Sequence, residues 1–134
     1  MIKDWMVRDV ITVTPRTSVK DAFSLMKKHN IRHLPVLRAG QLVGIVSDRN
    51  LRRPDCSDQF HSWDDFYRID DVMEVEDVMT TNPMTIAPNA EILQAAIIMI
   101  ERKFGALPVV DQEQHLVGII TVPDILKALV ASQK

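Results

Sequence analysis

The sequence predicts an α+β protein that consists of two β-α-β-β-α units packed about a pseudo-twofold axis. This prediction is based on an internal repeat, in which three segments recur in the same order. Residues 12–15 match 85–88 and residues 34–37 match 107–110 at an offset of 73, and residues 42–47 match 116–121 at an offset of 74. The second copy therefore has one extra residue in the intervening turn. Two similar units can stack so that equivalent clefts form between them, and we expect the function to reside in those clefts.

Each unit is expected to begin with a short strand that runs into a proline, followed by a helix. The strands are predicted at Val10–Val13 and Met84–Ile86. Apolar residues then recur at positions i, i+3, i+4 and i+7, which places them on one helical face. These residues are Val19, Ala22, Phe23 and Met26 in the first copy and Ile92, Ala95, Ala96 and Met99 in the second. Ser18 is the expected N-cap of the first helix.

A β-hairpin and a further helix complete each unit. The hairpin strands are predicted at Leu34–Leu37 and Leu42–Ser47, and at Leu107–Val110 and Leu116–Thr121. Polar residues that favour turns separate the two strands of each pair, and they include Gly40 in the first copy. The last helix of the second copy is marked by Ile125, Leu126, Leu129 and Val130.

The repeat divides the chain into a first repeat at 1–54, an acidic linker at 55–76 and a second repeat at 77–134. The net charge is +7 over residues 1–54, −8 over 55–77 and −1 over 78–134. The linker also contains Phe60, Trp63, Phe66 and Tyr67. Three interpretations remain open: a solvated segment pinned by these aromatic residues, a docking surface for a partner, or an acidic strap over the basic first repeat.

Composition excludes several classes of protein. The chain has 134 residues, of which 46% are hydrophobic and 25% charged, as in an average globular protein. No apolar run approaches the roughly 18 residues that span a bilayer, and early charges argue against a secretory signal, so we expect a cytoplasmic protein without a membrane segment. Cys56 has no partner for a disulfide, and the only close histidine pair, His29 and His33, straddles a helix end, so no metal site is expected.

Neither catalysis nor nucleic-acid binding is expected. The sequence has no glycine-rich phosphate loop, no recognisable nucleophile with its base, and no paired carboxylates outside the linker. The basic residues of the first repeat are interspersed with core positions and lack aromatic neighbours. We therefore predict that the protein is not an enzyme.

The first helix of the second copy predicts self-association. Residues 92–100 are apolar nearly all round the helix, and a single sheet cannot cover such a surface. We expect a homodimer. The alternative is an unusually deep position of this helix within one chain.

These motifs together resemble tandem CBS domains, the Bateman module. The resemblance rests on the repeated β-α-β-β-α pattern, the proline after the first strand, the apolar-Pro-Val pair that opens each hairpin, and Gly-apolar-apolar-[Ser/Thr]-x-x-[Asp/Asn] at its close. It covers nearly the whole chain apart from residues 55–77, with no catalytic domain attached, so the chain looks like a stand-alone CBS pair. The resemblance implies a regulatory element that binds adenine nucleotides or related adenosyl ligands between its repeats. It also implies dimerisation, commonly into a flat disc of four repeats.

Thr121-Val122-Pro123-Asp124 has both a structural and a functional interpretation. As Ser/Thr-x-x-acid before an apolar helix it is a capping box, and a proline suits the first helical turn. A carboxylate can also accept two hydrogen bonds from a ribose diol, and a hydroxyl beside helix amides suits phosphate. The resemblance implies that Asp124 holds ribose and that Thr121 lies near the phosphates. In the first copy, Ser47 is followed by Asn50, which lacks the charge-assisted acceptor.

The resemblance also implies which residues face each cleft. Arg32 and His33 would face Asp124, with Arg49 as a further phosphate-binding cation, whereas Gly105, Ala106 and Pro123 would face Asn50. We therefore expect one nucleotide per chain in the Asp124 cleft, with its base against Ile11, Thr12 and Ile119. The second, weaker cleft would contain Ser47, Asn50 and Thr85. Taken alone, each of the three cations is better explained as an ordinary surface charge, and it is their convergence on one cleft that favours phosphate binding.

Two functions remain on this basis. The first is a regulatory module that senses AMP, ADP or ATP, with S-adenosylmethionine or NAD as less favoured ligands, and relays the ligand level to an unidentified partner. The second is a ligand-free dimerisation or scaffold module in which the capping box is only a cap.

Overall fold

The computed structural model describes residues 1–51 and 73–133 of the chain. The chain forms two compact units, and neither unit is a continuous segment. Residues Ile11–Asn82 make one unit, which we call the first-repeat unit. Met1–Val10 and Pro83–Lys134 together make the other, the second-repeat unit.

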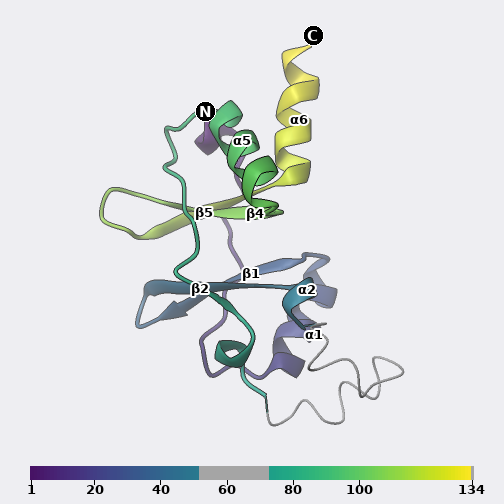
Figure 1. Cartoon of the computed structure of the whole chain (residues 1–134), viewed down its shortest axis with the longest axis vertical. Coiled ribbons are helices and arrows are strands. Elements are labelled where there is room, and N and C mark those ends of the chain that lie inside the picture. The colour runs from purple at the N-terminus through teal and green to yellow at the C-terminus, as the bar shows by residue number, and fades with distance from the viewer. Residues whose placement is uncertain (52–72, 134) are drawn as a thin grey trace. The chain divides into compact units, whose positions relative to one another are not determined.

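The first-repeat unit contains a three-stranded antiparallel sheet with two helices beside it (Figure 1). Its elements are α1 (Val19–His29), β1 (His33–Arg38), β2 (Gln41–Ser47), α2 (Asp48–Leu51), the 3-10 helix η3 (Val75–Asp77) and β3 (Thr80–Thr81). The strand order is β1-β2-β3, and α1 contacts both β1 and α2. The buried face of α1 consists of the four residues predicted from its spacing, Val19, Ala22, Phe23 and Met26.

The second-repeat unit repeats this arrangement with a two-stranded hairpin. Its elements are the 3-10 helix η1 (Ile2–Asp4), α5 (Ile92–Arg102), β4 (Ala106–Val110), β5 (Leu116–Thr121) and α6 (Val122–Ser132). β4 and β5 are antiparallel, α5 contacts β4, and α6 contacts both β5 and α5. Ala95 and Met99 are buried on α5, as predicted, whereas Ile92 and Ala96 are half-buried.

The α+β class, both hairpins and the helices of the two repeats are confirmed, with one correction. The first strand predicted for each copy is reduced to a single parallel bridge, Val13 with Val36 and Ile86 with Val109. The amide of Val13 donates to the carbonyl of Pro35 at 3.1 Å, and the bridge ends there because Pro15 follows two residues later and has no N–H. The predicted N-cap is present, since Ser18 Oγ accepts a hydrogen bond from the amide of Asp21 at 2.9 Å.

The extra residue of the second copy lies in its hairpin turn. The first hairpin turns through Ala39 and Gly40, both at positive φ. In the second hairpin, Asp111 Oδ1 accepts hydrogen bonds from the amides of Glu113 and His115, each at 2.9 Å. The longer turn is therefore closed by a side chain rather than by backbone conformation alone.

The segment that precedes each repeat packs in the unit of the other repeat. The amides of Ile2 and Lys3 donate to the carbonyls of Ala90 and Pro88, at 2.9 and 2.8 Å. In the first-repeat unit, the amides of Val75 and Glu76 donate to the carbonyls of Thr17 and Pro15, at 2.8 and 3.0 Å. These are the same contacts displaced by 73 residues, and the side chains of Ile2 and Val75 are both fully buried.

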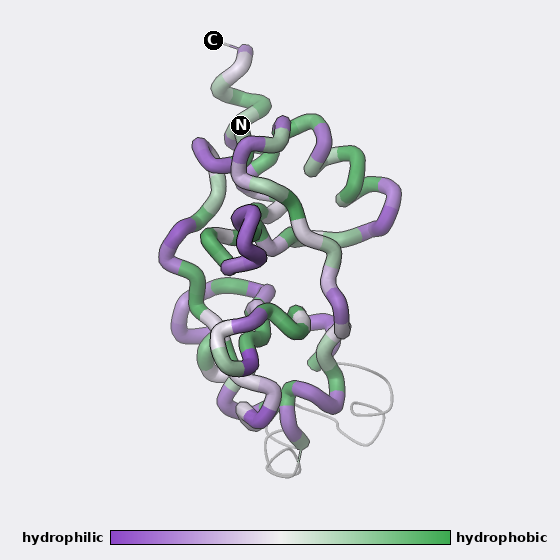
Figure 2. Tube along the Cα trace, turned by 90° about the vertical axis from the view of Figure 1, so that its left-hand side faces the viewer, coloured by the Kyte–Doolittle hydropathy of each residue, from purple (hydrophilic) through white to green (hydrophobic). Residues whose placement is uncertain are grey.

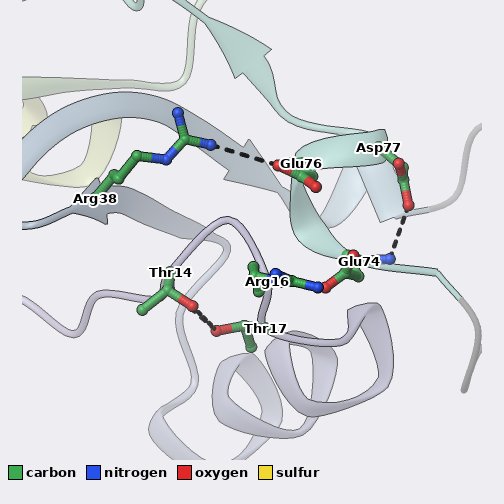
Figure 3. Close-up of polar contacts among 7 residues, drawn as sticks. All are labelled: Thr14, Arg16, Thr17, Arg38, Glu74, Glu76 and Asp77. Atoms are coloured by element: carbon green, nitrogen blue, oxygen red, sulfur yellow. Dashed lines mark hydrogen bonds and ion pairs between the residues drawn. The ribbon is translucent and has the colours of Figure 1, made fainter.

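Ion pairs reinforce the position of η3 in the first-repeat unit. Figure 3 shows Arg38 directed at Glu76 and Arg16 at Glu74, and each pair is separated by 3.5 Å. Both pairs are exposed, so we expect each to contribute at most about 1 kcal/mol. The exchange of leading segments means that the spatial units differ from the sequence repeats, and the boundaries 1–54, 55–76 and 77–134 stay a prediction. The interpretations of the acidic linker fall largely on residues 52–72, which lie outside the described residues.

Two glycines allow the leading segments to approach the sheets. A Cβ on Gly118 would lie 2.6 Å from Met6 Sδ and 2.9 Å from the carbonyl oxygen of Val7. A Cβ on Gly44 would lie at the same distances from Met79 Sδ and the carbonyl oxygen of Thr80. Because one neighbour in each case is a backbone carbonyl of a segment that pairs with the sheet, it cannot move aside without loss of pairing.

We predict that Gly118→Ala and Gly44→Ala each destabilise the protein by about 1–3 kcal/mol, the usual cost of overpacking. Urea denaturation would measure the loss. Gly40→Asn is the matched control, because Gly40 has open space around it and Asn tolerates its φ of 80°. Equal stability of Gly118→Ala and the wild type would contradict the close packing of residues 6 and 7 on β5.

Candidate functional site

The capping box predicted at the beginning of α6 is present and contains a buried carboxylate. The amide and the hydroxyl of Thr121 both donate hydrogen bonds to Asp124 Oδ2, each at 2.9 Å. Asp124 is 8% exposed and is the only buried polar or charged side chain among the described residues. Pro123 lies in the first helical turn, as expected. The two hydrogen bonds and the positive end of the helix dipole compensate part of the cost of burying this charge.

The second oxygen of Asp124 retains capacity to bind. A carboxylate has about four lone-pair positions, and Thr121 uses Oδ2 alone. Within residues 1–51 and 73–133, no donor is hydrogen-bonded to Oδ1. Capping therefore uses only one of the two carboxylate oxygens of Asp124.

The corresponding cap in the first-repeat unit has the same geometry without the charge. The amide and the hydroxyl of Ser47 donate to Asn50 Oδ1 at 2.8 and 3.0 Å, and the amide of Asn50 donates to Ser47 Oγ at 3.1 Å. An amide oxygen is therefore sufficient for capping in this fold. The difference between the two caps is one negative charge.

Cationic side chains lie next to the Ser47–Asn50 cap. The amide of Asp48 donates to the carbonyl of Arg32 at 3.0 Å, and His33 is the cross-strand neighbour of Ser47. Arg32 and Arg49 are exposed, whereas His33 is half-buried. Arg32, His33 and Arg49 are therefore gathered at the end of the β1–β2 hairpin that leads into α2.

The imidazole of His33 is shifted toward its neutral form. Burial lowers the pKa of His33 below its ordinary value of 6.5, the nearby charge of Asp48 opposes this shift, and the charge of Arg32 adds to it. A neutral imidazole at physiological pH can both donate and accept a hydrogen bond. An anion bound beside it would favour the protonated form.

At the matching end of the β4–β5 hairpin, the positions of Arg32, His33 and Arg49 are occupied by the uncharged residues Gly105, Ala106 and Pro123. There the amide of Val122 donates to the carbonyl of Gly105 at 3.1 Å, and Ala106 is the cross-strand neighbour of Thr121. The carboxylate of Asp124 and the three cations thus belong to different units.

Of the residues predicted to contact a base, Ile119 lies in β5, whereas Ile11 and Thr12 lie outside the strands, just before the bridge at Val13. Ile119 is 7% exposed, and its amide and carbonyl are both hydrogen-bonded to Val7, at 3.0 and 2.9 Å. Ile11 and Thr12 are half-buried, and in the described part of the chain no hydrogen bond engages their backbone. The backbone of Ile11 and Thr12 therefore has groups available to hydrogen-bond the edge of a base, whereas the backbone of Ile119 is already paired.

The predicted site residues are divided between the two units. The second-repeat unit contains Thr85, Ile119, Thr121 and Asp124, and the first-repeat unit contains Ile11, Thr12, Arg32, His33, Ser47, Arg49 and Asn50. The structure brings Thr121 to Asp124 and gathers the cations near Asn50. The approach of those cations to Asp124 stays a prediction.

Each unit also has a depression that the motifs of the sequence did not predict. The depression in the first-repeat unit, of about 440 Å³, lies at the turn of the hairpin, opposite the capped end, and is lined by Thr14, Pro15, Arg16, Leu37, Arg38, Ala39 and Glu76. Its counterpart, of about 500 Å³, is lined by Lys3, Thr85, Ile86, Ala87, Pro88, Asn89, Val110, Asp111, Gln112 and Gln114. The residues that line the two depressions correspond at the same offset of 73. The internal repeat of the sequence could therefore have indicated that the two depressions are equivalent. Thr85, which we predicted in the weaker cleft, lines the depression of the second-repeat unit.

Neither a metal site nor a membrane helix is found in the described residues. No cluster of three or more His, Cys, Asp or Glu side chains there is arranged to bind a metal ion. The helices in the same residues are too short or too polar to traverse a bilayer.

Comparison with known proteins identifies relatives over nearly the whole chain. The family model described as CBS domain matches residues 2–54 and 75–131. Inosine-5'-monophosphate dehydrogenase of Korarchaeum cryptofilum (strain OPF8) is 35% identical over 123 residues, which are 92% of this chain and 23% of that enzyme. The chain spans less than half of the length of the first curated relatives, 23–46% of it. Because the match covers only 23% of the enzyme, it does not assign the catalytic activity of that enzyme to this chain.

Solved structures of CBS pairs match the fold. CBSX2 from Arabidopsis thaliana, in its complex with AMP, is 30% identical, with a TM-score of 0.84 over 99% of this chain and 98% of that one. The CBS domain pair of protein MJ0100, in complex with 5'-methylthioadenosine and S-adenosyl-L-methionine, is 27% identical, with a TM-score of 0.82 over 100% and 98%. Together with the repeated fold and the two equivalent caps, these matches show that the chain belongs to the CBS domain family and carries two CBS domains in tandem.

Proposed function

We propose that this CBS pair is a regulatory module that binds AMP, ADP, ATP or a related adenosyl compound between its two repeats. It relays the level of that ligand to a partner protein in the cytoplasm. The observation that carries the proposal is the buried carboxylate of Asp124, whose Oδ1 has no donor among the described residues. The similar CBS pairs CBSX2 and MJ0100, which are complexed with AMP and with adenosyl compounds, support this class of ligand.

The charge of Asp124 exceeds what capping requires. Asn50 makes the same two contacts to Ser47 with a neutral oxygen. A buried carboxylate carries a larger desolvation cost than a buried amide, and the helix dipole offsets at most about 2 kcal/mol of it in a partly buried geometry. A ribose diol would donate two charge-assisted hydrogen bonds to this carboxylate, which are about twice as strong as neutral ones.

The cations of the first-repeat unit suit the phosphate end of a nucleotide. Arg32 and Arg49 are exposed and have five N–H donors each, and the half-buried imidazole of His33 lies beside them. In the proposed complex these three side chains bind the phosphates of the nucleotide whose ribose is held by Asp124. The backbone of Ile11 and Thr12 then reads the edge of the base.

A ligand-free dimerisation or scaffold module is the second candidate. The large aliphatic side chains exposed on α5 and α6 favour it, because surfaces of this kind commonly mark contacts with other proteins. We propose that the chain is a homodimer in either case. Ligand binding separates the two candidates, since a scaffold has no need of a free carboxylate.

We predict that AMP, ADP or ATP raises the melting temperature of the wild type and that Asp124→Asn weakens binding about tenfold, the difference between a charged and a neutral acceptor. Asn is chosen because Asn50 shows that it preserves the cap. Differential scanning fluorimetry and isothermal titration calorimetry would measure both effects, with S-adenosylmethionine and NAD as further ligands. Asn50→Ala should leave binding largely intact.

The sensor proposal fails if none of these ligands stabilises the wild type at millimolar concentration. Loss of binding in Asn50→Ala but not in Asp124→Asn would show that the nucleotide binds in the cleft of Asn50. Stabilisation by about 2.7 kcal/mol is expected at a hundredfold excess over Kd.

The phosphate contacts can be tested separately from the ribose contacts. We predict that Arg32→Gln and Arg49→Gln each weaken AMP binding about tenfold, as for loss of a hydrogen bond to a charged group, and leave adenosine binding unchanged. Arg38→Gln is the matched control, because Arg38 is also exposed on this hairpin but lies at its turn. An equal loss of affinity for adenosine would show that the arginines do not contact phosphate.

His33 should report the bound phosphate through its titration. We predict that its pKa lies below 6.5 in the free protein and rises when AMP binds, because the phosphate charge favours the imidazolium. NMR titration of the imidazole would measure both values, and adenosine should cause no comparable rise. Since the folded-state pKa is depressed, His33 contributes stability that is present above pH 6.5 and is lost as the pH falls below it. An unchanged pKa at saturating AMP would place the phosphates elsewhere.

A further inference from the structure

The depressions at the turns of the two hairpins contain the same pair of opposite charges with the signs exchanged. In the first-repeat unit the pair is Arg38 and Glu76, and the equivalent residues of the second-repeat unit are Asp111 and Lys3. In each pair, one residue lies at the turn of the hairpin and the other lies in the 3-10 helix of the leading segment. Each depression is therefore bordered by a cation and an anion from different segments.

Backbone hydrogen bonds hold the two pairs in equivalent positions. The residues that precede Arg38 and Asp111 donate through their amides to the carbonyls of Val13 and Ile86, at 2.9 and 3.0 Å. The amides of the two charged residues in the leading segments donate to equivalent proline carbonyls, at 3.0 and 2.8 Å. The backbone thus places the members of both pairs alike, up to the point where the hairpin turns differ in length.

The side chains pair in the first-repeat unit and do not pair in the second-repeat unit. Arg38 Nη2 lies 3.5 Å from Glu76 Oε2, as Figure 3 shows. Among the described residues, no ion pair joins Lys3 to Asp111, and the ammonium group of Lys3 has no hydrogen-bond or ion-pair partner. The depression of the second-repeat unit is also the larger, at about 500 Å³ against about 440 Å³. Its two opposite charges therefore border an open space instead of closing it.

The turn of the second hairpin holds the carboxylate of Asp111 in its ionised form. Oδ1 accepts the hydrogen bonds from the amides of Glu113 and His115. The pKa of Asp111 is lowered from its ordinary value, chiefly by the hydrogen bond from the amide of His115. Oδ2 lies 3.7 Å from His115 Nδ1, which is beyond hydrogen-bond distance. This second oxygen can therefore accept a hydrogen bond from a ligand.

The rest of the lining combines amide and aliphatic side chains. Figure 2 shows the hydrophilic colouring of the turn at residues 111–115. The amide side chains are those of Asn89, Gln112 and Gln114, and the apolar ones are those of Ile86, Ala87, Pro88 and Val110. Small-molecule sites are typically hollows of about 300–1,000 Å³ that are mainly apolar, with a few polar groups that orient the ligand. The depression therefore has the size and the lining of a site for a small ligand.

We propose that this depression binds a free amino acid, whose carboxylate pairs with the ammonium group of Lys3 and whose ammonium group pairs with Asp111. The bound amino acid gives each charge the partner that Arg38 and Glu76 find in each other. Its side chain lies against the aliphatic part of the lining, which favours aliphatic amino acids. The proposal does not depend on nucleotide binding, because none of the residues assigned to the nucleotide lines this depression.

A zwitterion suits this pair of charges better than a ligand with one charge. A carboxylate without an ammonium group would be attracted by Lys3 and repelled by Asp111, and an amine without a carboxylate would meet the reverse. A zwitterion makes both contacts favourable, and charge-assisted hydrogen bonds are about twice as strong as neutral ones. The two opposite charges therefore select amino acids over simple acids and amines.

The position of Lys3 links the ligand to the rest of the second-repeat unit. Lys3 lies in the leading segment, in which Val7 pairs with Ile119 of β5, and Asp111 lies at the hairpin turn. A ligand held by both residues joins two segments that are far apart in the sequence. Because unfolding separates these segments, the ligand binds the folded state alone and stabilises it.

The first test concerns the class of ligand. We expect aliphatic amino acids at millimolar concentration to raise the melting temperature of the full chain in differential scanning fluorimetry. In isothermal titration calorimetry, the corresponding acid and amine should bind at least about tenfold more weakly, as for loss of one hydrogen bond to a charged group. For leucine these analogues are 4-methylpentanoate and isopentylamine. The proposal is overturned if none of the standard amino acids raises the melting temperature, or if either analogue binds as tightly as its parent.

The second test uses substitutions to locate the site. We expect Lys3→Gln and Asp111→Asn each to weaken binding of the amino acid at least about tenfold. Asn keeps an oxygen that can accept hydrogen bonds from the amides of Glu113 and His115, so the turn should stay closed. Glu76→Gln, at the position equivalent to Lys3, is the matched control and should leave the affinity unchanged. Unchanged affinity in Lys3→Gln or Asp111→Asn, or an equal loss in Glu76→Gln, would refute the assignment.

The third test locates the ligand in the wild type. In an NMR titration, the amino acid should shift the amide signals of Lys3, Glu113 and His115, which lie at the depression. Largest shifts at Ser47 or Thr121 would place it at the capped ends of the hairpins and overturn the proposal. A wild type that binds the amino acid but not AMP would support this site and refute the nucleotide sensor, and the opposite result would do the reverse.

Discussion

The close approach of each leading segment to a hairpin is the constraint on which the rest of this structure depends. Gly118 allows Met6 and Val7 to lie against β5, and the backbone of Val7 pairs with Ile119. Two residues later β5 ends at Thr121, where the cap of α6 begins. The leading segment therefore fixes the strand whose end carries Thr121, and through the capping box it fixes Asp124. Gly44 and the strand at Thr80 do the same for the cap at Ser47.

The two caps differ by one negative charge, so comparing them shows what that charge contributes beyond capping. Both hold the beginning of a helix with two hydrogen bonds to one side-chain oxygen, at 2.8 to 3.0 Å. The fold alone therefore does not distinguish Asp from Asn at this position. The difference appears in solvation, because a buried carboxylate loses far more hydration than an amide. A ligand that donates hydrogen bonds to Asp124 recovers part of that loss, which is why we assign the charge to binding rather than to capping.

Local features of this chain could be predicted from the sequence, whereas contacts between distant segments could not. The helices, the hairpins, the N-cap at Ser18 and the capping box at Thr121 depend on patterns within a few residues, and those predictions are confirmed. The first strands were overestimated, because apolar residues before Pro15 and Pro88 indicate extended backbone but not how many partners it finds. The exchange of leading segments depends on contacts such as Ile2 with Ala90, and similarity between the copies does not show which copy a segment joins. For the same reason Thr121 and Asp124 could be paired from the sequence, whereas their approach to Arg32 stays a prediction.

The helix α6 takes part in both the ligand binding and the self-association that we propose. Its first turn contains Asp124, and it also exposes the aliphatic side chains of Leu126, Leu129 and Val130. In the homodimer that we propose, a ligand that changes the position of this helix would change how well its exposed aliphatic side chains fit a second copy of the chain. Thermodynamic linkage then makes the effect reciprocal: if the nucleotide strengthens association by some factor, association strengthens nucleotide binding by the same factor. A ligand with equal affinity for both positions of the helix would transmit nothing, however tightly it bound. Regulation through association therefore requires that Asp124 bind its ligand better in one association state than in the other.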